Sequence, residues 1–167
     1  EKEVLEVETP LMCASAATDP FLQPIPVLYR APSSVTDKIF YLQTSPEFPM
    51  KRLLASGSGS IYQICKAFRN GEVGRLHNPE FTMLEWYRLG FDHLTLMQEV
   101  DTLLQEILQT PPAHKMTYAQ VFEAFLQINP HMLDAQALRE VAHAKGLQDV
   151  AGIDNQDKDI WLQRLMS

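Results

Sequence analysis

The chain has 167 residues, of which 46% are hydrophobic and 9% aromatic, enough to bury the core of one domain. Its formal net charge of -7 argues against a broad surface for nucleic acid. Apolar runs such as 121–126 fall far short of the roughly 20 residues of a membrane span, and the N-terminal pattern does not resemble a signal peptide. We therefore expect a cytoplasmic protein with no membrane span, whose Cys13 and Cys65 stay reduced.

The first third of the chain predicts extended structure with one short helix. Strands are indicated by alternation or by β-branched and aromatic residues. They are expected at residues 4–11, near 27–30 and at 38–44. Pro10 ends the first strand because proline lacks a backbone donor, and the proline-rich stretch 13–37 predicts a long loop. A helix is then expected over 46–54, with Ser45 as its N-cap.

A long hairpin and a helical region are predicted next. Glycine and serine at 57–60 indicate a helix end and a turn. Residues 61–68 and 81–89 predict two strands joined by a loop of about ten residues. After Gly90 the apolar spacing becomes helical. Helices are expected at 94–108 behind Asp92 as N-cap, at 118–127, at 134–145 and at 158–166.

The two strands of this hairpin gather chemically useful side chains on one face. Alternation groups Phe81, Met83, Glu85 and Tyr87 with Gln63, Cys65, Ala67 and Arg69. Antiparallel pairing would bring Arg69 near Phe81, and Trp86 would point away into the core. An arginine fork suits phosphate oxygens, an aromatic ring suits a base, and a carboxylate suits an ammonium. The face would fit ATP beside an amino acid, or it is a solvated face with an unrelated arginine and glutamate.

Longer stretches resemble a known family. Residues 68–70 and 77–87 read Phe-Arg-Asn and His-Asn-Pro-Glu-Phe-Thr-Met-Leu-Glu-Trp-Tyr. They closely resemble motif 2 of the class II aminoacyl-tRNA synthetases, in the lysyl-type form. Residues 4–12 look like the end of motif 1, whose proline lies at a dimer interface, and 44–53 look like the lysyl-type segment before motif 2. The resemblance covers about residues 4–108.

The resemblance implies which residues bind ATP. Arg69 would contact the α-phosphate and stabilise the charge that develops as the substrate carboxylate attacks it, which makes it the catalytic residue. His77 and Asn78 would serve the triphosphate and the nucleotide, and Phe81 would stack on adenine. The further ATP-binding positions are Asn70, Gly71 and Glu72. The family usually has glutamate where this chain has Gly71, so Glu72 would take that role or the Gly71 backbone would act alone.

The same resemblance implies an amino-acid site and co-substrates. A lysine-like substrate would be held by Ser45, Pro46, Glu47, Glu85 and Tyr87. The substrate carboxylate attacks ATP in line, so the enzyme needs no nucleophile of its own. Mg²⁺ would offset phosphate charge, and we assign no metal ligand within this chain.

Two branches of the family share this core. One charges lysine tRNA, and the other attaches (R)-β-lysine to a lysine of elongation factor P. Three features look more like the second branch: the loop before Lys38, the sequence around Gly71 and above all Trp86. The resemblance therefore implies activation of lysine or (R)-β-lysine and transfer to elongation factor P. A lysyl-tRNA synthetase core and a non-catalytic synthetase-like module that binds a partner are the alternatives.

The expected fold is α+β, an antiparallel sheet that carries the site and is flanked by helices. Residues 1–110 would form the motif 1 and motif 2 core, and 111–167 a helical region of the same catalytic domain. Motif 3, which carries a second ATP-binding arginine in the family, is not found in the sequence. We therefore expect the N-terminal portion of a catalytic domain, incomplete for adenylation by itself. Homodimerisation through motif 1 is a further expectation.

Overall fold

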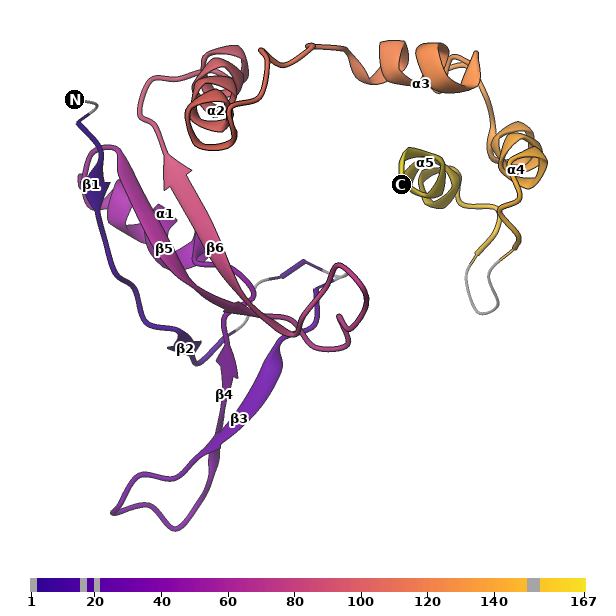
Figure 1. Ribbon diagram of the computed structural model, residues 1–167. Coiled ribbons are helices and arrows are strands. Elements are labelled where there is room, and N and C mark those ends of the chain that lie inside the picture. Colours follow the sequence, from indigo (N-terminus) through magenta and orange to yellow (C-terminus); the bar gives the residue numbers. More distant parts are fainter. Residues whose placement is uncertain (1–2, 16–17, 20–21, 150–153) are drawn as a thin grey trace. The chain divides into compact units, whose positions relative to one another are not determined.

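The computed structural model describes residues 3–15, 18–19, 22–149 and 154–167 (Figure 1). The chain divides into two compact units, residues 1–100 and 101–167. The strands are β1 (Leu5–Glu6), β2 (Met12–Cys13), β3 (Ile25–Tyr29), β4 (Lys38–Leu42), β5 (Ile61–Phe68) and β6 (Glu80–Tyr87). The helices are α1 (Glu47–Ala55), α2 (His93–Leu108), α3 (Tyr118–Leu126), α4 (Ala135–Ala144) and α5 (Lys158–Met166). The expected α+β class is confirmed.

The hairpin of β5 and β6 is the main feature of the first unit, and its strands lie side by side in Figure 1. Antiparallel pairing runs from Ile61 opposite Tyr87 to Phe68 opposite Glu80, and β1 joins the other edge of β5 in parallel. One face of β5 is buried: Ile61, Gln63, Cys65 and Ala67 are at most 9% exposed. Ile64, between them on the opposite face, is 60% exposed. The alternation predicted from the sequence therefore separates a covered face from an open one.

The expected strand at 4–11 is wrong in its extent. Only Leu5–Glu6 joins β5, whereas Met12–Cys13 pairs with β4 in a second sheet of order β2-β4-β3. The segment around Pro10 carries the chain from one sheet to the other, because the Val7 N–H still donates to Tyr62 O while Leu11 O accepts from the Gln43 N–H. A pattern of alternating residues indicates extended backbone, but it does not say which strand will be the partner.

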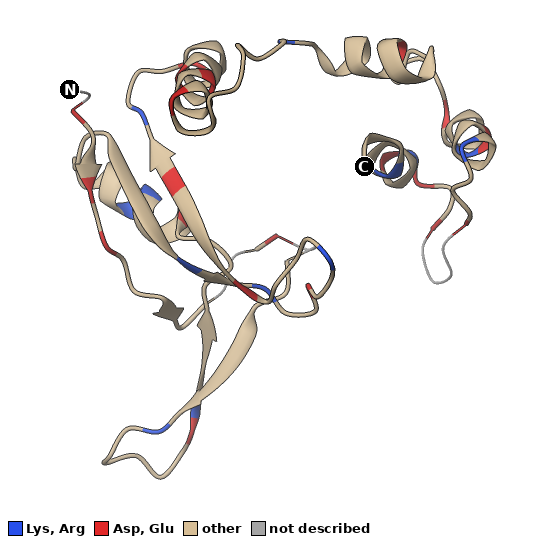
Figure 2. Ribbon diagram, in the orientation of Figure 1, with Lys and Arg blue, Asp and Glu red and all other residues tan. Residues whose placement is uncertain are grey.

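The second sheet is formed largely by the β3–β4 hairpin. β3 and β4 pair from Ile25 opposite Leu42 to Tyr29 opposite Lys38, and Figure 2 shows both strands nearly free of charge. A double contact between Arg30 and Asp37, at 2.6 and 2.9 Å, closes the hairpin near its tip. This pair is exposed and so adds little stability.

The predicted helices are present, and their ends follow the expected capping chemistry. Asp92 Oδ1 accepts the Thr95 backbone N–H at 2.8 Å at the start of α2, as predicted. Thr117 and Gln120 form a capping box at the start of α3, and Asp134 caps α4. At α1 the prediction is off by one residue: Pro46 occupies the N-cap position, although Ser45 Oγ still accepts the Glu47 N–H at 3.4 Å.

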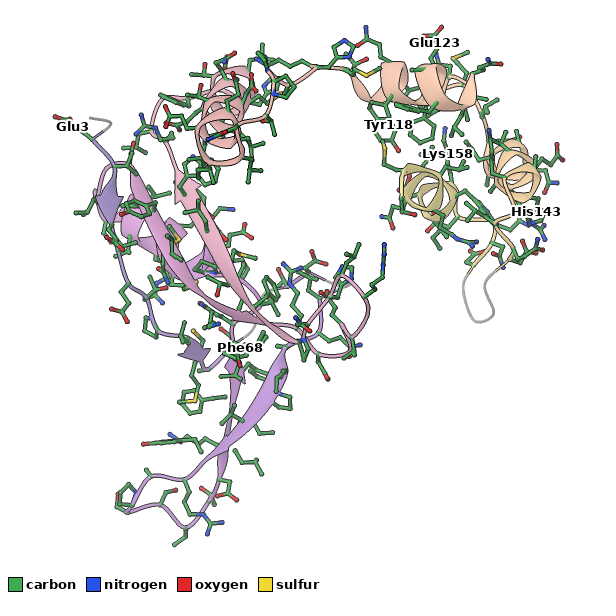
Figure 3. The ribbon with its side chains drawn as sticks, viewed as in Figure 1. Glu3, Phe68, Tyr118, Glu123, His143 and Lys158 are labelled. Carbon is green, nitrogen blue, oxygen red and sulfur yellow. The ribbon has the colours of Figure 1, made fainter. Side chains whose placement is uncertain are left out.

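The second unit has its own small core between α4 and α5. Leu138, Ala142 and Trp161 are fully buried there, and Trp161 Nε1 donates to Asn155 O at 2.9 Å. His143 of α4, labelled in Figure 3, meets the Trp161 ring edge to face, with 5.8 Å between the ring centroids. Among the described residues, no helix is long and apolar enough to span a bilayer. The prediction that both units belong to one catalytic domain stays a prediction.

Candidate functional site

Arg69 lies directly after the last residue of β5. Its backbone N–H donates to Pro79 O at 2.9 Å, so the hairpin pairing continues one step past the strand. Its guanidinium lies over the Phe81 ring, with Cζ 5.1 Å from the centroid, and its Nε donates to Thr44 O at 3.4 Å. The side chain is 24% exposed, so the cation is held by protein contacts but remains reachable. The predicted proximity of Arg69 and Phe81 is confirmed.

Glu72, rather than Gly71, brings a carboxylate to this arginine. Glu72 Oε2 lies 3.9 Å from Arg69 Nη1, and its side chain is 29% exposed. Gly71 has a φ of +80°, the left-handed backbone region that favours glycine, and this turn allows the next residue to reach back toward Arg69. The contact is compatible with the first of the two alternatives at this turn, in which Glu72 takes the role of the family's glutamate, and that role stays a prediction.

The other predicted nucleotide-binding residues lie in the loop between the two strands. Gly74 and His77 exchange backbone hydrogen bonds of 3.1 and 3.3 Å, which turns the loop back toward β6. The side chains of Asn70, His77 and Asn78 are exposed. The backbone of Asn70 is fixed, since its N–H donates to Gln23 O at 2.7 Å. The loop thus presents these three side chains to solvent beside the Arg69 cluster.

Glu85 and Tyr87 form a second cluster farther along β6. The Tyr87 hydroxyl donates to Glu85 Oε1 at 2.7 Å. Burial, this hydrogen bond, and the charges of Glu85 and Glu47 together raise the pKa of Tyr87, so the phenol stays protonated at neutral pH. Glu47, the first residue of α1, is close enough for its charge to act on Tyr87, and it pairs with Lys51 one helical turn later. Two carboxylates and a hydroxyl suit a ligand that carries an ammonium group.

The burial of several polar residues near these clusters was not predicted from the sequence. Thr44 is 2% exposed and Gln63 1%, and Thr9 Oγ1 donates to Gln63 Oε1 at 3.0 Å. Gln63 faces Glu85 across the hairpin, which the alternation did indicate. Thr44 and Gln43, which is 6% exposed, directly precede the predicted substrate segment at Ser45. The sequence placed both in an expected strand and Thr44 in the lysyl-type segment, but it did not indicate their burial.

The prediction that Trp86 belongs to the core is wrong. Trp86 is half-buried, and its Nε1 donates to Glu99 Oε2 of α2 at 3.3 Å. Alternation placed it correctly on the face opposite Gln63, but α2 covers that face only in part, and Leu84 there is 41% exposed. Glu99 also pairs with Arg88 Nε at 3.2 Å.

Within the described parts of the chain, no three His, Cys, Asp or Glu side chains gather as a possible metal-ligand set. Magnesium commonly reaches proteins through one or two carboxylates together with substrate phosphates and water. We assign none of the described residues as a magnesium ligand.

Comparisons with known proteins match nearly the whole chain. The family model described as tRNA synthetases class II (D, K and N) matches residues 1–164. The elongation factor P–(R)-β-lysine ligase of Vibrio cholerae is 50% identical over 167 residues, which are all of this chain and 51% of that protein. The protein of the same name from Erwinia tasmaniensis is 49% identical over 165 residues, 99% of this chain and 50% of that protein. The chain thus spans about half the length of the curated relatives it matches.

Proposed function

Because the chain belongs to the class II tRNA synthetases of the D, K and N type, we propose that its full-length protein activates lysine or (R)-β-lysine with ATP and transfers it to elongation factor P. The observation that carries the proposal is the pair of clusters on one hairpin. Arg69, Glu72 and Phe81 stand at one end, and Glu85 with Tyr87 at the other. Phe81 and Glu85 are four residues apart, about 13 Å along an extended strand.

This spacing suits ATP at the arginine end and an amino acid at the carboxylate end. Adenine would stack on the face of the Phe81 ring that Arg69 leaves open. Arg69 would turn toward the α-phosphate and stabilise the negative charge that builds up when the amino-acid carboxylate attacks there. Glu85, Tyr87 and Glu47, with the Ser45–Pro46 backbone, would hold the amino groups and so orient that carboxylate. Asn70, His77, Asn78 and the Gly71 backbone would complete the nucleotide contacts.

The proposed reaction has two bond-making steps. In the first, the amino-acid carboxylate oxygen bonds to the α-phosphorus and pyrophosphate leaves. In the second, the ε-amine of a lysine on elongation factor P bonds to the acyl carbon and AMP leaves. Mg²⁺ would accompany ATP and offset its charge.

The acceptor and the setting are also part of the proposal. The similarity to ligases named for elongation factor P favours a protein acceptor over tRNA. The full-length protein would work in the cytoplasm as a homodimer joined through residues 4–12. Leu11 and Met12, which are 37% and 38% exposed, offer apolar surface for that contact.

Mass spectrometry of elongation factor P tests the proposal. After incubation with the full-length protein, ATP and (R)-β-lysine or lysine, the factor should gain the mass of one lysyl group, and it should not when ATP is omitted. Parallel reactions with lysine tRNA separate the two branches, since charging of tRNA without modification of the factor would replace the proposal with a lysyl-tRNA synthetase. Neither product, with no ATP–pyrophosphate exchange, would indicate a non-catalytic module.

A further inference from the structure

Gln43 connects three segments of the first unit. Its backbone N–H donates to Leu11 O and its carbonyl accepts from the Phe68 N–H, both at 2.8 Å. Its side-chain Nε2 donates to Lys66 O at 2.9 Å and to Cys65 Sγ at 3.3 Å. Phe68, labelled in Figure 3, ends β5 where that strand meets the chain that leaves β4. At 6% exposed, Gln43 contacts protein rather than solvent.

Both halves of the candidate site are direct neighbours of these contacts. Thr44 follows Gln43, and its carbonyl accepts from Arg69 Nε. The segment Ser45–Glu47, which would hold the amino acid, comes next in the chain. On the other strand, Phe68 is bonded to Gln43 and directly precedes Arg69. The hydrogen bonds of Gln43 therefore lie between the amino-acid segment and the strand end that carries Arg69.

The side chain of Gln43 is poorly explained by stability alone. Within the described residues, its buried Oε1 has no hydrogen-bond partner, and neither does Thr44 Oγ1 beside it. A buried carbonyl without a partner is unfavourable, so the cost of Oε1 offsets part of the stability that the amide donor contributes. The amide Nε2 nevertheless bonds the edge of β5 in two places, which fixes geometry.

We propose that Gln43 is a positioning residue for amino-acid activation: its amide holds the end of β4 against the end of β5, so that Arg69 and Ser45–Glu47 keep a fixed separation. The inference rests on the proposed function for the reaction that it serves. A shift of about 1 Å between reacting groups can cost on the order of 100-fold in rate. Glu85 and Tyr87, which would hold the substrate amino groups, lie on β6, whereas the side chain of Gln43 bonds Cys65 and Lys66 on β5.

Gln43→Met in the full-length protein is the test, because methionine keeps the length of the side chain and removes both donors. In ATP–pyrophosphate exchange, kcat per active site, counted by a burst of pyrophosphate release, should fall about 10- to 100-fold. The KM for lysine or (R)-β-lysine should rise by a smaller factor than kcat falls, since Glu85 and Tyr87 keep their places on β6 while the Ser45–Glu47 segment shifts. A loss of folded protein would reduce the burst amplitude and leave kcat per active site unchanged.

Asp101→Leu is the matched control. Asp101, in the second unit, is also 6% exposed, and its Oδ1 accepts the Ala113 N–H at 2.8 Å. The Asp101→Leu substitution should lower thermal stability as much as Gln43→Met does, but it should leave kcat per active site unchanged. A crystal structure of Gln43→Met supplies a readout that is independent of activity: Arg69 Nε should lie about 1 Å farther from Thr44 O than the present 3.4 Å.

The outcomes separate the two ideas. A wild-type protein that shows no ATP–pyrophosphate exchange refutes the proposed function. In that case the crystal structure of Gln43→Met still tests whether Gln43 positions Arg69. An unmoved Arg69–Thr44 contact, or a Gln43→Met protein with wild-type kcat per active site, overturns the role of Gln43.

Discussion

Glu85→Gln should weaken amino-acid binding much more than it slows adenylation. The amide oxygen of glutamine can still accept the Tyr87 hydroxyl, which now donates to Glu85 Oε1 at 2.7 Å, so the hairpin should keep its shape. What the change removes is the negative charge offered to a substrate ammonium. A hydrogen bond to a charged group contributes about 1.5–3 kcal/mol. At about 1.36 kcal/mol for each factor of ten, KM should rise roughly 10- to 150-fold.

ATP–pyrophosphate exchange at saturating ATP measures this effect, with lysine and (R)-β-lysine varied in separate series. We expect kcat to stay within about threefold of wild type, because the carboxylate acts in the ground state and the transition state alike. Tyr87→Phe is the matched control: it removes one neutral hydroxyl of the same cluster, a loss of about 0.5–1.5 kcal/mol, and should raise KM only about 2- to 13-fold. A Glu85→Gln protein with reduced kcat and unchanged KM would refute the assignment of Glu85 to substrate binding.

Three further predictions concern the fold and its titrating groups. Leu138→Ala, at a fully buried position, should lower the free energy of unfolding in urea by about 2–5 kcal/mol, and a loss below about 1 kcal/mol would contradict the packing between α4 and α5. Asp149 accepts hydrogen bonds from Arg139 and contacts His143, and these contacts lower the pKa of Asp149. Since the folded pKa lies below the unfolded value of about 3.9, Asp149→Asn should lower the Tm at about pH 7, and its difference from wild type should shrink as the pH falls below about 3.9 and through the lower, folded pKa. A difference that grows in acid would show the opposite linkage. Burial raises the pKa of the Cys65 thiol, so iodoacetamide at about pH 8 should alkylate Cys65 slowly in the native protein and rapidly in urea. Peptide mass spectrometry measures the alkylation, and fast alkylation of the native protein would show that the thiol is accessible.

The hairpin and its chemical face could be predicted because they depend on local patterns. β5 occupies residues 61–68 as predicted, since the alternation is uninterrupted and glycines stop the preceding helix. The same period of two placed Phe81 and Glu85 on the face that pairs with Ala67 and Gln63.

Features that depend on distant partners could not be predicted. Thr9 and Gln63 are 54 residues apart in sequence, and no local pattern tells that their side chains meet in a buried hydrogen bond. Alternation along β6 places Trp86 on the face opposite Glu85. How far the rest of the chain covers that face cannot be read from the strand itself. The split of residues 4–11 between two sheets likewise depends on β4 and β5 as partners.

The most direct measurement is ATP–pyrophosphate exchange by the full-length protein and its Arg69→Ala variant, with lysine and with (R)-β-lysine. If the guanidinium beside Phe81 stabilises charge at the α-phosphate, wild type should exchange with at least one of the two, and Arg69→Ala should lower kcat about 100- to 1,000-fold for whichever amino acid is used. A wild-type protein that exchanges with neither, or an Arg69→Ala variant that exchanges at the wild-type rate, would contradict the assignment of this hairpin to adenylate formation.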